Sequence, residues 1–78
     1  MLKFVLEKET NSNVVYKYYP EGKDDVGIVS YDKVNRECKI VILATQDIHK
    51  RYAFKMFSRI RKCAENGFFE KEGTIAWY

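Results

Sequence analysis

The chain has 78 residues, fourteen Lys and Arg against eleven Asp and Glu, a net charge of +3, and a composition that is 46% hydrophobic and 15% aromatic. This length predicts a single small domain spanning 1–78, and the apolar content excludes a disordered chain. No apolar run approaches the ~18 residues of a membrane span, and residues 1–6 are too short for a signal peptide, so we expect a cytoplasmic protein of bacterial or phage type that does not contact membranes.

Four strands are predicted, at residues 2–9, 14–19, 26–32 and 38–44. In the first of them Leu2, Phe4 and Leu6 alternate with polar or smaller side chains and share one face. The second is a β-branched and aromatic run that Pro20 ends, and the fourth is the most apolar of the set. Because every connection is short, we expect the strands to form an antiparallel meander.

A helix is predicted over 46–66, where the hydrophobic period changes. Thr45 is its expected N-cap, and Asn66 with Gly67 predicts its end. The apolar stripe of this helix comprises Ile48, Tyr52, Ala53, Met56, Phe57, Ile60, Cys63 and Ala64. The tail after it is predicted to be an extended arm or a short strand over 74–78. The expected fold class is therefore α+β, an antiparallel meander of about four strands with one C-terminal helix on one face.

The two faces of the predicted sheet are expected to differ in what covers them. The helix should pack on the face that carries Leu2, Phe4, Leu6, Cys38, Ile40 and Ile42. The opposite face should carry Val5, Val15, Tyr19, Val41 and Leu43, with Lys3, Lys17 and Lys39 between them. An apolar patch of that size is unusual for a monomer. Either the C-terminal arm covers it with Phe69, Ile75, Trp77 and Tyr78, or another molecule does.

No residue pattern in the sequence indicates catalysis or a metal site. Cys38 and Cys63 lack metal-ligand spacing and are interpreted as buried free thiols, with a disulfide between them as the alternative. His49 has no nucleophile and orienting group beside it. The loop acids lack the ligand spacing of a calcium loop; they are Glu21, Asp24 and Asp25. We therefore expect a protein that is not an enzyme and that needs no cofactor.

The stretch HKRYAFKMFSRIRKC, residues 49–63, holds six of the fourteen Lys and Arg and no carboxylate. Residues 46–66 contain six basic and two acidic groups, a net charge of +4, against −1 for the rest of the chain. On a helical wheel Arg51, Lys55, Arg59 and Lys62 fall within roughly 80° of one another, and Phe54 lies off the apolar stripe. These cations could neutralise phosphates and the ring could stack on a base. The alternative is a solvated face whose Lys and Arg stems shield the sheet.

Four stretches, YYPEG, VGIVSYD, KRYAFKMFSRIRK and EGTIAWY, resemble a family of small uncharacterised proteins from Gram-positive bacteria and their mobile elements. The likeness covers nearly the whole chain and implies no activity and no site residues. The order of four strands and a helix is also similar, at the level of the fold, to DNA-binding domains of mobile-element integrases, in which the sheet reads the DNA.

Two functions follow as alternatives. The first is a small non-catalytic binding module, a nucleic-acid-associated accessory protein that uses the basic helix face without reading sequence. The second is a protein–protein interaction module or homodimer that uses the second sheet face and the aromatic C-terminal arm.

Overall fold

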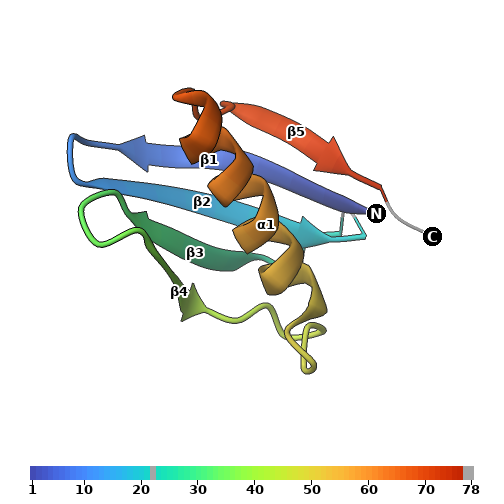
Figure 1. The fold of residues 1–78 in the computed structure, drawn as a ribbon. Helices are drawn as coiled ribbons and strands as arrows, with labels where there is room; N and C mark the ends of the chain where they lie inside the picture. The colour runs from blue at the N-terminus through green and yellow to red at the C-terminus, as the bar shows by residue number, and fades with distance from the viewer. Residues whose placement is uncertain (22, 77–78) are drawn as a thin grey trace.

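The computed structural model describes residues 1–21 and 23–76, which form one antiparallel sheet and one helix (Figure 1). The elements are β1 (Leu2–Glu9), β2 (Asn13–Pro20), β3 (Gly27–Asp32), β4 (Glu37–Ile42), α1 (Arg51–Asn66) and β5 (Glu72–Ile75). The strands lie in the order β4-β3-β2-β1-β5, and α1 crosses one face of the sheet. The predicted α+β class and its meander are confirmed, and the tail forms a short fifth strand, one of the two alternatives predicted for it.

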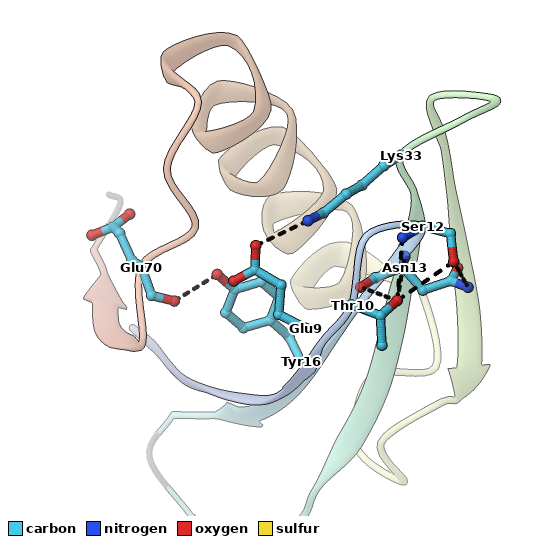
Figure 2. Close-up of polar contacts among 7 residues, drawn as sticks. All are labelled: Glu9, Thr10, Ser12, Asn13, Tyr16, Lys33 and Glu70. Atoms are coloured by element: carbon cyan, nitrogen blue, oxygen red, sulfur yellow. Dashed lines mark hydrogen bonds and ion pairs between the residues drawn. The ribbon is translucent and has the colours of Figure 1, made fainter.

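Short polar turns connect the strands of the meander. Between β1 and β2, the hydroxyl oxygen of Thr10 accepts the backbone N–H groups of Ser12 and Asn13 at 3.3 and 3.0 Å (Figure 2). Between β3 and β4, one carboxylate oxygen of Asp32 accepts the N–H groups of Val34 and Asn35 at 2.8 and 3.0 Å. Such side-chain acceptors replace the ladder bonds that a reversing chain loses.

Residues 72–75 of the C-terminal tail join the sheet as β5 and do not lie over the open face. β5 pairs antiparallel with β1, Leu2 opposite Ile75 and Phe4 opposite Gly73. The strand begins at Glu72, two residues before the predicted start, because main-chain pairing continues along the exposed edge of β1. Ile75 packs against the core on the helix side, as does Phe69 before it. Trp77 and Tyr78 lie outside the described residues.

The core lies between α1 and the helix-facing side of the sheet. It comprises Leu2, Phe4, Val14, Tyr16, Tyr18, Val29, Tyr31, Ala44, Ala53, Met56 and Ile60. Three buried tyrosines contribute much of this volume, and the Phe4 and Tyr16 rings meet edge to face at 5.6 Å. Large rings therefore supply apolar area that a chain of this length would otherwise lack.

The helix begins at Arg51, five residues later than predicted. Thr45 does not cap it; its N–H donates to the Asp25 carboxylate at 2.8 Å. The chain enters α1 through Lys50 in the left-handed conformation, φ 61°. Ile48 therefore lies before the helix and is 72% exposed, outside the apolar stripe. The remaining stripe residues are buried or half-buried against the core.

The last residues of β4 lie on different faces from those expected. The register of β3 and β4 shifts between Ile28 and Val29. Ile28 pairs with Ile42 and Val29 pairs with Ile40, so Val41 is an extra residue in β4 with no partner in β3. An extra residue reverses the alternation beyond it. Ile42 accordingly lies on the open face, 52% exposed, and Leu43 packs against the core. The predicted placement of both residues was wrong.

Candidate nucleic-acid interface

The solvent-facing side of α1 presents most of the predicted cationic stripe. Arg51, Lys55 and Lys62 are exposed, and Arg61 is exposed on the neighbouring flank. Phe54 is 52% exposed, with its ring 5.7 Å from that of Phe57. The rotation of α1 about its own axis causes this arrangement. Because Ala53, Met56 and Ile60 are buried against the sheet, the opposite side of the helix faces water.

Arg59, the fourth residue of the predicted stripe, is held by a carboxylate. Its Nε lies 2.6 Å from Glu70 Oε1 and its Nη2 lies 3.1 Å from Oε2, a bidentate pair. The guanidinium carbon also lies 5.6 Å from the centre of the Phe4 ring. The hydrogen bonds from Arg59 lower the pKa of the Glu70 carboxyl. Arg59 therefore ties the segment before β5 to α1, with its charge compensated.

Two other side chains, those of Tyr16 and Cys63, also contact Glu70. The Tyr16 hydroxyl donates to the Glu70 carbonyl oxygen at 2.6 Å (Figure 2), and burial raises the pKa of this phenol above its usual range. The Cys63 thiol lies 3.6 Å from Glu70 Oε1, and burial raises its pKa. A protonated thiol and a protonated phenol are poor nucleophiles. The arrangement thus fastens α1, β2 and the β5 segment together.

Acid should weaken the ion pair between Arg59 and Glu70. The pKa of Glu70 in the folded protein is lowered from 4.5, so its contribution to stability is present above that value and is lost as pH falls through the lowered pKa. We expect the free energy of unfolding, measured in urea from pH 7 to pH 3, to fall less steeply in Glu70→Gln than in the wild type. Glu72→Gln, an exposed position on β5, is the matched control and should keep the wild-type slope. Identical slopes in all three proteins would contradict the assignment.

The face of the sheet opposite α1 has no covering element among the described residues (Figure 1). Val5, Val15 and Tyr19 lie on it half-buried. Val41 and Ile42, in the edge strand β4, are each 52% exposed. Lys17 crosses the face and pairs with Glu7 at 3.3 Å. Of the other residues assigned to a protein interface from the sequence, Leu43 packs against the core on the helix side and Trp77 lies outside the described residues.

The groups considered for catalysis or metal binding are separate from one another. Cys38 and Cys63 are free thiols on opposite flanks of α1, since Cys38 contacts Phe57 and Cys63 contacts Glu70. Within residues 1–21 and 23–76, no three His, Cys, Asp or Glu side chains are grouped so that they could hold a metal ion. In the same part of the chain, no helix has the length and apolar character needed to cross a membrane.

No protein-family model, no curated protein and no solved structure matches this chain. The resemblance to the Gram-positive family therefore stays a prediction from the sequence.

Proposed function

We propose that the protein is a small non-catalytic module that binds nucleic acid through the solvent-facing side of α1. One observation carries the proposal, the exposure of Arg51, Lys55 and Lys62 along a single helix whose segment has a net charge of +4. From the first to the last of these residues the helix rises roughly 16 Å. A row of that length can follow several phosphates of one strand and does not close around one small anion.

The number of phosphate contacts sets the expected salt dependence. Arg59 is engaged by Glu70, whereas the other three cations of the stripe, Arg51, Lys55 and Lys62, are exposed, and we expect one phosphate contact from each. Three contacts give a log–log salt slope of about −2.7 on duplex DNA and about −2.1 on a single strand. Because phosphate contacts carry no sequence information, binding through this row should tolerate changes of sequence.

The test is a titration of labelled duplex and single-stranded DNA and RNA between ~50 and ~200 mM salt. Lys62→Gln should lower affinity and reduce the magnitude of the duplex slope by about 0.9. Lys39→Gln is the matched control, because it removes the same charge from β4 in the sheet, away from α1, and should leave the slope unchanged. If Lys39→Gln changes the slope and Lys62→Gln does not, the sheet and not α1 contacts the phosphates.

A second candidate function is association with another protein or with a second copy through the open sheet face. The exposure of Val41 and Ile42 on the unpaired edge of β4 favours it. Apolar association is not weakened by salt, whereas phosphate binding is. If the wild type binds no nucleic acid at micromolar protein in ~50 mM salt, and its solution mass is that of a dimer at low and high salt, this candidate replaces the first.

A further inference from the structure

A pocket of about 610 Å³ opens beside the last turns of α1. The end of β3, the turn between β3 and β4, and the segment after α1 form its other walls. Its chemically distinctive lining comprises three cations, two rings and one carboxylate, namely Lys33, Arg36, Arg61, Tyr31, Phe69 and Glu65. Pockets of ~300–1,000 Å³ are of the size that holds small ligands, so one nucleotide fits this volume.

Two of the three cations in the pocket wall are available to a ligand. Lys33 is already engaged, with its Nζ 2.9 Å from Glu9 Oε2 (Figure 2) and 5.1 Å from the centre of the Phe69 ring. Arg36 and Arg61 are exposed, and in the described part of the chain no carboxylate lies within 4.0 Å of either guanidinium. A guanidinium binds a phosphate through paired N–H groups, which makes both residues phosphate ligands by chemistry.

The backbone that presents Arg36 is fixed by the turn before it. Asp32 accepts hydrogen bonds from the Val34 and Asn35 N–H groups, and Arg36 itself adopts the left-handed conformation with φ 58°. Arg61 is oriented by the Phe57 ring, whose centre lies 5.9 Å from its guanidinium carbon. Both cations therefore project from ordered backbone into one hollow, which lowers the entropy cost of binding an anion between them.

The rings give the pocket an apolar side. Phe69 is half-buried and tilts by 43° against Tyr31, with 6.0 Å between ring centres. Tyr31 is buried beside it, and the Lys33 ammonium lies over the Phe69 ring, so a base that stacks on that side of the ring takes the place of Lys33. A partly exposed ring beside two guanidinium groups is the combination that stacks a base while its phosphate is held. Bases in a duplex are already stacked and paired, so they cannot enter such a pocket without an opening cost.

We propose that this pocket binds one unpaired nucleotide of a single-stranded nucleic acid, with its base on Phe69 and its phosphate on Arg36 and Arg61. The proposal rests on the function proposed above and adds to it a preference for single strands. Arg61 and Lys62 project about 100° apart around α1, so a strand that follows the row of cations must also cross the helix to reach the mouth of the pocket beside Arg61. The pocket then supplies the base contact that the row of cations lacks.

The first test leaves the protein unchanged. A ten-nucleotide single strand, a duplex of the same length and an abasic strand with the same number of phosphates are titrated at one salt concentration. The base-containing strand should bind about tenfold more tightly than the abasic strand, because stacking on a ring contributes on that scale. The base-containing single strand should also bind more tightly than the duplex, although the duplex has the higher charge density. Equal affinity for the three ligands would overturn the proposal and leave the proposed function standing.

Variants then locate the effect. Phe69→Leu keeps an apolar side chain without a ring and should lower single-strand affinity about tenfold while leaving abasic affinity unchanged. Arg36→Gln should weaken the single strand, and Lys62→Gln should weaken all three ligands. If Phe69→Leu weakens the abasic strand as much as the base-containing one, the ring does not stack and the proposal fails. If adenosine monophosphate perturbs the Phe69 resonances but no strand or duplex binds, the site takes a free nucleotide and the proposed function fails too.

Discussion

Asp47→Ala is expected to lower the free energy of unfolding by about 3–5 kcal/mol, because one buried carboxylate satisfies three donors. Asp47 is 2% exposed. Its Oδ1 accepts the Tyr52 N–H at 3.0 Å, and its Oδ2 accepts the Ala53 N–H at 2.9 Å and the Tyr18 hydroxyl at 3.1 Å. Alanine would leave both N–H groups at the start of α1 and the buried hydroxyl without this acceptor. That loss approaches the whole stability of a small domain.

The measurement is urea unfolding followed by far-ultraviolet circular dichroism. Asp24→Ala is the matched control, since it removes an exposed carboxylate from a loop and should change stability by no more than ~0.5 kcal/mol. Asp47→Asn keeps one acceptor oxygen and should fall between the two. A wild-type unfolding midpoint for Asp47→Ala would contradict the role given to the carboxylate.

The role of Asp47 shows where sequence reasoning about the helix fails. A local rule assigns the cap to the Ser, Thr, Asp or Asn that immediately precedes the apolar period, which favoured Thr45. In the structure the carboxylate reaches α1 across a left-handed residue, and the Tyr18 hydroxyl holds it from 29 positions away in the chain. A contact of that sequence separation is set by the packing of β2 against α1, which no local pattern contains.

The parts of the fold that could be predicted depend on local periodicity. The alternation of Leu2 and Phe4 and the helical spacing of Met56 and Ile60 identify buried faces without tertiary information. The face of Ile42 could not be predicted, because it depends on a register shift between β3 and β4. β5 was predicted only as one of two alternatives for the tail, since its pairing with β1 is fixed by a partner distant in sequence.

For the candidate site too, the sequence predicts what depends on local periodicity and misses what depends on distant contacts. The exposure of Arg51 and Lys62 follows from the helical wheel, whereas the ion pair of Arg59 with Glu70 requires the path of the chain after α1. Lys33 and Arg36 were not predicted as site residues, because only the folded turn brings them beside Arg61. Their one sequence signal is the pair of cations that flanks a tight turn next to Tyr31.

Gly27→Ala is expected to cost about 3 kcal/mol, the upper end of the range for overpacking a core. A Cβ atom at Gly27 would overlap ring carbons of Tyr18 and would lie 2.5 Å from its hydroxyl oxygen. The ring has no room to retreat, because it is fully buried and its hydroxyl both donates to Asp47 and accepts the Ala44 N–H at 3.1 Å. The extra methyl group must therefore displace β3 or break the hydrogen bonds of Tyr18.

Gly67→Ala separates this steric effect from the general cost of replacing a glycine. Gly67 ends α1 with φ 73° and has no heavy atom within 4 Å of the added carbon, so only backbone strain of about 1 kcal/mol is expected there.

A double-mutant cycle tests whether the cost at Gly27 comes from the Tyr18 ring. In a Tyr18→Ala background the ring is absent, and Gly27→Ala should then cost less than ~1 kcal/mol, which gives a large coupling energy. If the two costs simply add, the glycine is required for a reason other than the approach of the Tyr18 ring to the β3 backbone.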